Sequence, residues 1–381
     1  MIKKVVFIGL SGGVDSAVSA ALLKRQGYQV VGVFIKTWHP KFLACNEEEE
    51  RRDAMRVAAH LDIPFLTFDF ENIYKKEVAD YMIHEYRIGR TPNPDVMCNK
   101  EVKFGVFLRK AISMGADFVA TGHYAQVGEA EITFLNGLAG AGDPENRGPG
   151  KKKFLLRQGL DPMKDQSYFL WTLKQEQLSK IIFPVGNLKK TKVRKLAKKF
   201  KLPVAEKKDS QGICFLGAVD LKEFLKRYIK EKRGKVMNTG GETIGWHNGA
   251  VFSTLGERHG FTITKKSPND NRYYIINKDV KKNILIVSDS RNFSSESPRK
   301  ILLNFRSGLG SSASVAFHNQ SFCLQLINTN WIDEIPNEGK NYTAQIRYHG
   351  EFLPCKIKII AKTKVRDTER SRRAEIIFEK P

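Results

Sequence analysis

The feature that most constrains the fold of this chain is a glycine turn near its N-terminus, Ser-Gly-Gly-Val-Asp-Ser at residues 11–16. An apolar run at residues 5–10 precedes the turn, and an alanine-rich segment follows it. This order predicts a strand, a tight turn and a helix whose first N–H groups converge on an anion. Ser11 and Ser16 add hydroxyl donors. We expect a phosphate-binding loop without the Walker lysine; the alternative is plain chain reversal.

Strands and helices alternate through the first third of the chain. Three further β-rich runs lie at residues 30–35, 65–70 and 118–121. Apolar residues at helical spacing predict helices over residues 47–60, from Tyr74 to Gly89, over 104–111 and over 165–178. Such alternation indicates an α/β domain with a parallel sheet covered on both faces. Because ligands bind at the carboxyl ends of such strands, the glycine turn, Ile35, the segment around Asn93 and Gly122 should meet at one edge.

Two segments outside this pattern have a clear composition. Residues 90–99 contain two prolines, so we expect an ordered loop rather than a helix there, with Cys98 in it. The glycine-rich residues 137–150 predict a surface insertion or hairpin tip. From residue 243 onward short β-rich runs alternate with turn residues, which predicts a C-terminal antiparallel β-barrel module.

The charge of the chain is large and unevenly distributed. At 381 residues, long enough for two or three domains, it carries 64 Lys and Arg against 41 Asp and Glu, a formal charge of +23. Residues 151–235 hold 24 basic and 8 acidic residues, which is +16 of the total. Such a bias predicts a polyanionic partner, with nucleic acid the first candidate.

Five cysteines are present, at positions 45, 98, 214, 323 and 355, and no two form a C-x-x-C pair. This argues against a disulfide framework and an ordinary zinc site, and we expect no resident metal. Cys98 and Cys214 stand near lysines, which favours thiol chemistry, whereas the other three are expected to be buried. No apolar run is long enough to span a bilayer, and the N-terminus is not typical of an export signal. We expect a cytoplasmic protein without a membrane partner.

The motifs together resemble a known family. The glycine turn is similar to the PP-loop of ATP pyrophosphatases, which holds pyrophosphate while AMP passes to an acceptor oxygen. The whole chain resembles the tRNA-specific 2-thiouridylases, which thiolate the wobble uridine (position 34) of certain tRNAs. The resemblance rests on these blocks: GLSGGVDS (9–16), TPNPDVMCNKEVKF (91–104), ATGHYA (120–125), KDQSYFL (164–170), DSQGICFLG (209–217) and AQIRYHG (344–350).

The resemblance implies a fold and a domain organisation. It implies a PP-loop ATP pyrophosphatase catalytic domain, of the adenine nucleotide alpha hydrolase-like class, over residues 1–179 and 208–226. A small central tRNA-binding domain would comprise residues 180–207 and 227–291, and the C-terminal antiparallel β-barrel residues 292–381. The family's final strand carries a Gly-Gln motif and a triple glycine that have no counterpart here, so we expect a truncation at that end.

The resemblance also implies a chemistry. The cofactor would be ATP with Mg²⁺, bound by Gly9, Leu10, Ser11, Gly12, Gly13, Val14, Asp15, Ser16, Ile35 and Gly122. Transfer of AMP to the uridine C2 oxygen makes a poor leaving group replaceable by sulfur. Cys214 would carry a persulfide delivered by an upstream donor protein, and Cys98 would resolve it by forming a disulfide with Cys214. Asp95 would act as acid or base at the target base.

For the tRNA, the resemblance implies two sets of contacts. Asn93, Pro94 and Asp95 would hold the target uridine, which must be turned out of the stacked anticodon loop. The positions expected to contact tRNA are His123, Lys164, Asp165, Gln166, Arg347 and Tyr348. The lysine-rich residues 189–208 would follow the tRNA backbone.

Two alternatives remain open at this point. An amide-forming PP-loop synthetase acting on a small molecule would share residues 11–16 but has no need of two reactive cysteines or a +16 segment. A tRNA-binding relative that has lost catalysis would keep the charge. Substitution of the two cysteines separates the first alternative, and pyrophosphate release on adding anticodon stem-loop RNA excludes the second.

Overall fold

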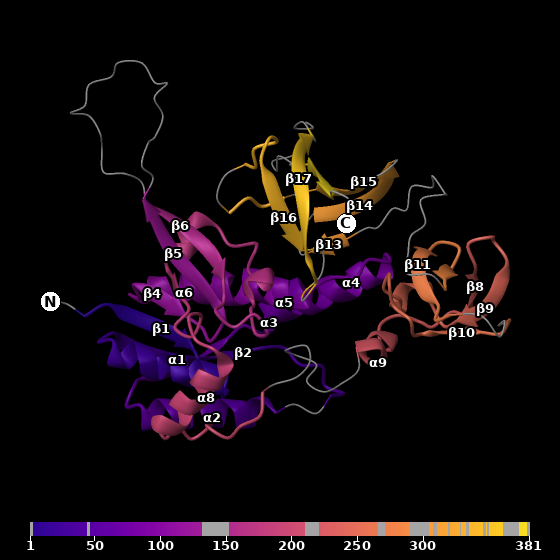
Figure 1. Ribbon diagram of the computed structural model, residues 1–381. Helices are drawn as coiled ribbons and strands as arrows, with labels where there is room; N and C mark the ends of the chain where they lie inside the picture. Colours follow the sequence, from indigo (N-terminus) through magenta and orange to yellow (C-terminus); the bar gives the residue numbers. More distant parts are fainter. Residues whose placement is uncertain are drawn as a thin grey trace, which may run out of the picture. The chain divides into compact units, whose positions relative to one another are not determined.

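Figure 1 shows the computed structural model of the chain. The structure describes residues 3–43, 46–131, 152–209, 221–265, 271–289, 305–307, 311–318, 321–327, 329–332, 335–345, 348, 350–360 and 373–378. Two compact units are present. Unit 1 comprises Met1–Lys75, Cys98–Gln211 and Asn330–Ile335, and unit 2 comprises Lys76–Met97, Gly212–Thr329 and Pro336–Pro381.

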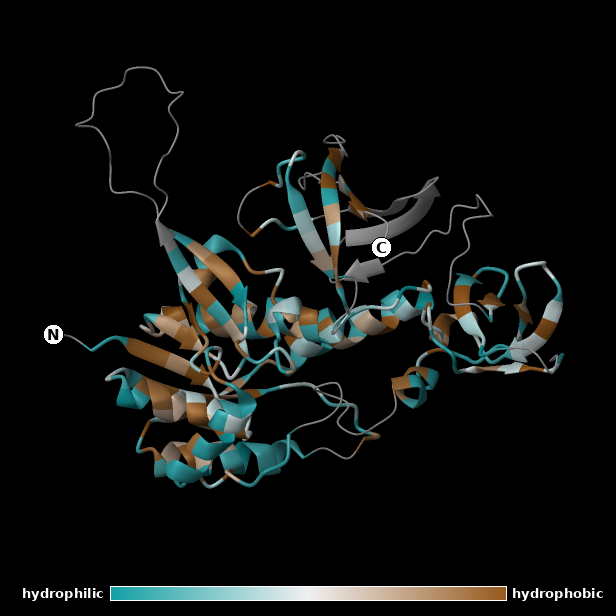
Figure 2. Ribbon diagram, viewed as in Figure 1, coloured by the Kyte–Doolittle hydropathy of each residue, from teal (hydrophilic) through white to brown (hydrophobic). Residues whose placement is uncertain are grey.

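Unit 1 is built on a five-stranded parallel sheet of order β3-β2-β1-β4-β7, which confirms the predicted α/β class. The strands are β1 (Val5–Gly9), β2 (Gln29–Lys36), β3 (Phe65–Asp69), β4 (Phe118–Ala120) and β7 (Ile181–Ile182). The central strand β1 is apolar along its length (Figure 2), and Val6 and Ile8 are fully buried. Because β1 is covered on both sides, the loop that follows it is held in a fixed position.

One helical layer of unit 1 consists of α1 (Val14–Arg25), α2 (Glu47–His60) and α8 (Lys190–Lys199), which lie together below the sheet in Figure 1. Helix α8 packs on α1 and contributes Val193 and Ala197 to the same hydrophobic core. Residues 180–207 lie in unit 1, whereas the predicted boundaries assign them to a central domain, and those boundaries stay a prediction. The α8 helix presents one apolar stripe, and α1 covers it.

A second helical run begins at Cys98 with a π-helix, η2 (Cys98–Phe107), and continues as α6 (Leu108–Ser113). The buried ring of Phe107 lies 6.1 Å from that of Phe68 in β3. Further along, β5 (Ala125–Glu131) and β6 (Lys152–Gln158) form an antiparallel hairpin. The surface insertion predicted at residues 137–150 lies outside the described residues.

The prediction of a loop over residues 90–99 is wrong for its second half, where α5 (Pro94–Met97) leads directly into η2. Pro94 occupies the first helical position, at which the missing N–H is not needed. The Asn93 side-chain oxygen accepts the N–H groups of Asp95 (3.1 Å) and Val96 (3.3 Å), as a helix cap does. The proline therefore starts a helix instead of preventing one.

The predicted helix over residues 165–178 is also wrong in extent. The segment forms a short 3-10 turn, η4 (Ser167–Phe169), and then a one-turn helix, α7 (Gln175–Leu178). The Asp165 carboxylate accepts hydrogen bonds from the Ser167 N–H (3.2 Å) and hydroxyl (2.9 Å), which favours a turn over a helix. By contrast, the helix predicted from Tyr74 to Gly89 is confirmed, as α3 (Glu71–Tyr74), η1 (Lys75–Asp80) and α4 (Tyr81–Arg87) follow one another without a gap.

Unit 2 contains a five-stranded sheet of order β10-β9-β8-β12-β11. Its strands are β8 (Gly234–Met237), β9 (Thr243–His247), β10 (Phe261–Ile263), β11 (Tyr274–Asp279) and β12 (Ile284–Ser288), and only the β8–β12 pair is parallel. A short helix, α9 (Leu221–Lys226), precedes them, and the 3-10 turn η5 (Ala250–Phe252) follows β9. Val236, Leu285 and Val287 are fully buried and form the centre of this sheet's core.

The C-terminal strands of unit 2 form a six-stranded antiparallel sheet of order β13-β14-β15-β18-β17-β16. They are β13 (Phe305–Ser307), β14 (Ser311–His318), β15 (Ser321–Ile327), β16 (Asn341–Gln345), β17 (Phe352–Ile360) and β18 (Arg373–Phe378). The predicted C-terminal antiparallel module is confirmed, and its closure into a barrel stays a prediction. Within the described ranges, none of the helices is both long and apolar enough to cross a membrane.

Candidate functional site: a phosphate loop and its ion-pair network

The glycine turn between β1 and α1 forms a loop that only glycine allows. Gly12 has φ +70°, and a Cβ at this position would lie 2.5 Å from the Glu50 carbonyl oxygen. Gly13 is the N-cap residue of α1 and supplies no side chain to the first N–H groups of the helix. These groups are therefore available to an anion at the positive end of the helix dipole.

Two serines close the loop on itself. The Ser16 hydroxyl donates to the Gly13 carbonyl oxygen (3.1 Å) and accepts the Ser11 N–H (3.3 Å). The Ser11 and Ser16 hydroxyl oxygens lie 3.3 Å apart. Both side chains are thus already oriented before a ligand binds, which lowers the entropic cost of binding.

The end of β4 lies directly against this loop. A Cβ on Gly122 would be 2.7 Å from the Ser16 nitrogen and 2.9 Å from the Asp15 carbonyl carbon, so the two segments are in close backbone contact. Ile35 lies two residues beyond Val33, which pairs with Gly9, and is therefore at the same edge of the sheet. The structure brings the loop, Ile35 and Gly122 together, and their contact with ATP stays a prediction.

An ion-pair network joins the loop to residues far along the chain. Asp15 accepts a hydrogen bond from the Tyr124 hydroxyl (2.7 Å) and one from Lys190 Nζ (2.7 Å). Lys190 also lies 2.9 Å from Asp209. Lys164 donates to Asp209 as well (3.0 Å), and Arg194 forms a further ion pair with it. Asp15 on α1 and Asp209 are therefore held by one shared ammonium group.

The electrostatics of the network follow from these contacts. Partial burial acts to raise the pKa of Asp209, but hydrogen bonds from Lys190 and Lys164 outweigh it and lower the pKa to about 2. Burial and then the neighbouring Asp15 charge raise the pKa of Tyr124 far above its ordinary value, so its hydroxyl stays protonated as a donor. Asp209 is therefore ionised at neutral pH, and Tyr124 is a neutral member of the network.

The residues of this network were not predicted from the sequence, apart from Asp15 and Lys164. Lys190 and Arg194 belong to the lysine-rich stretch that was assigned to the tRNA backbone, yet both side chains pair with carboxylates of unit 1. Lys207 does the same with Asp53 (2.7 Å). The other two members of the network are Tyr124 and Asp209. The one sequence signal for them is that they lie within family-matching blocks, Tyr124 in ATGHYA and Asp209 in DSQGICFLG.

The predicted tRNA-contact triplet supports the local backbone. Asp165 accepts the Gly159 N–H (2.8 Å), and the Gln166 side-chain oxygen accepts the Tyr124 N–H (3.0 Å). The Gln166 N–H in turn donates to the Tyr124 carbonyl oxygen (2.8 Å). These bonds fix the segment beside the end of β4, and a contact of the triplet with tRNA stays a prediction.

His123 is a buried residue, only 8% exposed. Its ring lies 5.8 Å from that of Phe104 and 5.9 Å from that of Phe183, and its Nδ1 is 2.7 Å from the Thr121 hydroxyl oxygen. Burial, followed by the nearby positive charge of Lys103, holds the pKa of His123 well below its ordinary value. The imidazole is therefore neutral at physiological pH, and its predicted contact with tRNA would be made without a charge.

The residues predicted to handle sulfur and the target base are only partly described. Cys98 is 3% exposed and opens η2 in unit 1, so it is a buried helical residue rather than the loop residue expected. Asn93, Pro94 and Asp95 belong to unit 2, with Asn93 capping α5. Tyr348 is described and exposed. Cys214 and Arg347 lie outside the described residues, so the approach of Cys214 to Cys98 stays a prediction.

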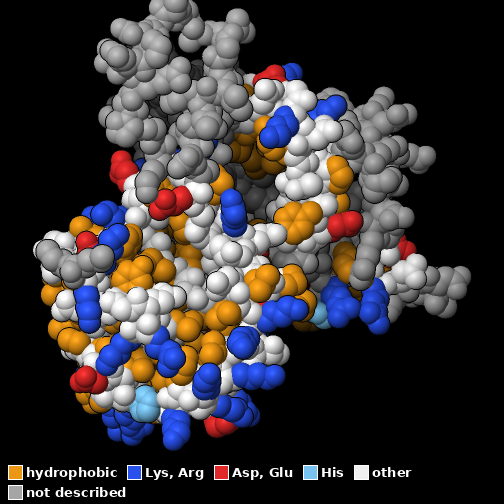
Figure 3. All heavy atoms as spheres, turned by 60° about the vertical axis from the view of Figure 1, so that its left-hand side comes forward, with side chains coloured by type: hydrophobic (Ala, Val, Ile, Leu, Met, Phe, Trp, Pro, Cys, Tyr) orange, Lys and Arg blue, Asp and Glu red, His pale blue; other side chains and the backbone are white. Residues whose placement is uncertain are grey.

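The outer face of α8 carries a cluster of unburied lysines. Val193 and Ala197 face the core, whereas the opposite face is lined by Lys192, Lys195, Lys198 and Lys199. Figure 3 shows Lys and Arg side chains gathered over the lower part of the molecule, at the height of α8 and α2 in Figure 1. This face suits a polyanion. Within the described ranges, no group of three His, Cys, Asp or Glu side chains could hold a metal ion.

Comparison with known proteins identifies the family to which the chain is related. A family model described as the tRNA methyl transferase HUP domain matches residues 4–218, and one described as the tRNA methyl transferase PRC-barrel domain matches residues 222–289. The tRNA-specific 2-thiouridylase MnmA of Geobacillus thermodenitrificans is 38% identical over 379 residues, 99% of this chain and 87% of that protein. The MnmA of Streptococcus thermophilus is 46% identical over 288 residues, 75% of this chain and 72% of that protein.

The similarity of the chain to solved structures is weaker. The U34-tRNA thiolase NcsA from Methanococcus maripaludis, solved with its [4Fe-4S] cluster, is 17% identical with a TM-score of 0.34, covering 59% of this chain and 64% of that one. An NMN synthetase from Francisella tularensis is 16% identical with a TM-score of 0.30, covering 54% and 66%. With 38% identity to a tRNA-specific 2-thiouridylase along nearly its whole length, the chain belongs to the tRNA-specific 2-thiouridylase family.

Proposed function

We propose that this protein catalyses the ATP-dependent 2-thiolation of the wobble uridine of tRNA, as a tRNA-uridine sulfurtransferase. The observation that supports this most is the cradle at the N-terminus of α1. There Gly12 and Gly122 leave no room for a Cβ, and the serines are oriented toward the loop backbone. Membership of the 2-thiouridylase family supplies the substrate class. The thiouridylase name fits the two predicted thiols better than the methyl transfer in the family model's description.

The first step is activation of the uridine. In this proposal the N–H groups at the start of α1 bind the pyrophosphate portion of ATP, and the C2 oxygen of the uridine attacks the α-phosphorus. Pyrophosphate leaves, and the oxygen becomes part of an AMP ester that can depart. Mg²⁺, when bound with ATP, would offset the charge of the phosphates. Asp15 is the carboxylate within the phosphate loop that could hold it.

The second step transfers sulfur with a balanced exchange of bonds. Cys214 carries a persulfide received from an upstream donor protein, and its terminal sulfur attacks C2 as AMP leaves. The Cys98 thiolate then attacks the Cys214 sulfur, so the persulfide bond breaks as a Cys98–Cys214 disulfide forms. Asp95 acts as the general acid or base at the target uridine. A thiol reductant must reduce the disulfide before the next turnover.

Binding of tRNA uses charge first and base contacts second. The exposed lysines of α8 follow the phosphate backbone, and the segment from Asn93 to Asp95 holds the uridine after it leaves the stack, at a cost of a few kcal/mol. Arg347 and Tyr348 add contacts to the tRNA. The proposed location is the cytoplasm, where tRNA and ATP are both present.

The test is mass spectrometry of RNA nucleosides after incubation with ATP, Mg²⁺, a persulfide or sulfide source and an anticodon stem-loop RNA. We expect 2-thiouridine from the wild type and none from Cys214→Ser when the sulfur comes from a persulfide. Cys98→Ser should leave the RNA linked to Cys214 through an S–S bond and release no 2-thiouridine, whereas Cys355→Ala, which removes a buried thiol of β17, should retain activity.

Two results would count against the proposal. Full activity of both Cys98→Ser and Cys214→Ser in amide formation on a small acceptor would favour an amidating synthetase. Failure of stem-loop RNA to trigger pyrophosphate release from ATP would favour a binding protein that has lost catalysis.

A further inference from the structure

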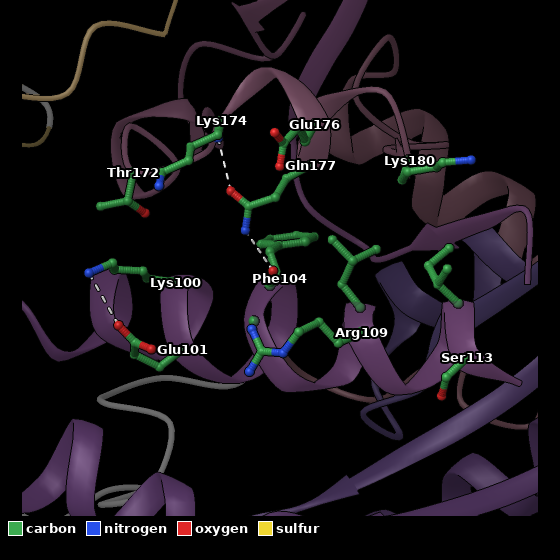
Figure 4. A pocket seen from close by; sticks show the side chains of 13 residues that line it. Lys100, Glu101, Phe104, Arg109, Ser113, Thr172, Lys174, Glu176, Gln177 and Lys180 are labelled. Carbon is green, nitrogen blue, oxygen red and sulfur yellow. Dashed lines mark hydrogen bonds and ion pairs between the residues drawn. The ribbon is translucent and has the colours of Figure 1, made fainter.

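Unit 1 contains a pocket that shares no residue with the phosphate loop, and it is called the α6–α7 pocket here. One wall is formed by η2 and α6, and the other by the segment from Thr172 to Lys180, which includes α7 (Figure 4). Its volume is about 680 Å³. That is within the range of small-molecule sites, which span roughly 300–1,000 Å³.

One hydrogen bond joins the two walls of the pocket, and a second one, within the α7 wall, orients the side chain that makes it. The Gln177 amide donates to the Phe104 carbonyl oxygen (2.7 Å), and its oxygen accepts the Lys174 N–H (2.9 Å). Gly105 forms part of the opposite wall, where a Cβ would lie 2.7 Å from the Lys100 carbonyl oxygen. The shape of the pocket is therefore set by the backbone and one amide side chain rather than by mobile surface groups.

Positive charge predominates in the lining. Four basic side chains line the pocket, Lys100, Arg109, Lys174 and Lys180, against two acidic ones, Glu101 and Glu176. One acid is already paired, since Lys100 lies 3.2 Å from Glu101. Among the described residues, Arg109, Lys174 and Lys180 have no ion-pair partner. The net charge of the lining matches a dianion.

A buried hydroxyl marks one end of the pocket. Thr172 lines it, is 8% exposed, and its Oγ1 makes no hydrogen bond to any described residue. In Figure 4 the side chains of Lys100 and Lys174 extend toward the end at which Thr172 lies. Burying a hydroxyl without a hydrogen-bond partner is unfavourable, and a ligand oxygen that accepts a hydrogen bond from Thr172 would remove this cost.

We propose that the α6–α7 pocket binds a small phosphate monoester, with the phosphate group between Lys100, Thr172 and Lys174. A monoester is a dianion near neutral pH, so its charge balances the lining, whereas one RNA phosphodiester carries a single charge. Lysines act as point charges toward phosphate oxygens, and the Thr172 hydroxyl donates the additional hydrogen bond. The carbon portion of the ligand lies over Leu108 and Ile112, which form the apolar part of the lining.

The test measures binding of ribose 5-phosphate and inorganic phosphate by isothermal titration to the full chain. Ribose 5-phosphate lacks the adenine that the ATP site recognises. The variants are Thr172→Val, which keeps the side-chain shape, and Lys174→Met, which keeps the aliphatic stem. The matched control is Lys3→Met, which removes the same charge from an exposed position at the N-terminal end.

We expect both pocket variants to weaken ribose 5-phosphate and phosphate binding at least ten-fold, and the control to change it less than two-fold. Thr172→Val should melt at the same temperature as the wild type or higher, because it removes an unmade hydrogen bond. Equal binding by the pocket variants and Lys3→Met would overturn the proposal. So would a loss of affinity for anticodon stem-loop RNA with phosphate binding unchanged, because the pocket would then hold RNA backbone.

Discussion

Substitution of Lys190 by methionine should loosen the contact between α8 and the phosphate loop. The variant keeps the aliphatic stem but removes the ammonium group shared by Asp15 and Asp209 (2.7 and 2.9 Å). Both carboxylates then lose a charged partner, while Asp209 keeps Lys164 and Arg194. The consequence should be local, in α1, α8 and the residues around Asp209.

The magnitude follows from the pKa of Asp209. A pKa of about 2 in place of the ordinary 3.8 corresponds to about 2.4 kcal/mol if counted in full. Because 34% of the Asp209 side chain is exposed, solvent screening reduces this to about 1 kcal/mol, which Lys190 shares with Lys164. The hydrogen bonds to Asp15 add about 1.5 kcal/mol, as expected for a charged donor that is only 12% exposed. We expect a total loss of about 2 kcal/mol.

Hydrogen exchange measured by mass spectrometry on peptides from α1 and α8 gives this local free energy without assuming two-state unfolding. The control is Lys195→Met on the exposed face of the same helix, which should change protection by less than about 0.5 kcal/mol. Since the folded pKa of Asp209 is lowered, its contribution is present above about pH 4 and is lost as the pH falls toward 2. Equal protection in the two variants, or a Lys190→Met effect that persists undiminished at pH 2, would refute the reasoning.

Three further predictions concern the loop, the buried histidine and the basic face. Gly122→Ala should weaken ATP binding more than ten-fold in equilibrium dialysis, because its Cβ would lie 2.7 Å from the Ser16 nitrogen. The control Gly9→Ala should bind ATP better than Gly122→Ala, because its Cβ would have no contact closer than 3.8 Å. Weaker ATP binding by Gly9→Ala than by Gly122→Ala would contradict the geometry. The stability of the wild type should fall as the pH drops below about 6.5, because the folded state holds His123 neutral while the unfolded state protonates it. His123→Phe should show a smaller pH dependence of the melting temperature between pH 7 and 5. A pH dependence equal to that of the wild type would show that His123 is not its source. Replacing Lys192, Lys195, Lys198 and Lys199 by Gln should reduce the slope of log affinity for tRNA against log salt by up to roughly four, and an unchanged slope would remove α8 from the tRNA surface.

Much of the fold of unit 1 could be predicted from local sequence patterns. The alternation of apolar runs predicted the parallel sheet, helix α2 spans the predicted residues 47–60, and the glycine turn lies between the expected strand and helix. The order of parallel strands also predicted that Gly122 meets the loop. These features depend on periodicity and on the conformational freedom of glycine, which neighbouring residues in the chain specify.

The pairing and the burial of individual side chains could be read only from the tertiary structure. Lys190 pairs with Asp15 across 175 residues, and nothing in its lysine-rich surroundings separates it from Lys192, which faces outward. Pro94 starts a helix because Asn93 caps it, and His123 is neutral because Phe104 and Phe183 enclose it. The sequence by itself determined which side chains are charged, apolar or flexible. Only the folded chain decided which charges are neutralised by a partner, because pairing and desolvation depend on distances between residues that the sequence does not place side by side.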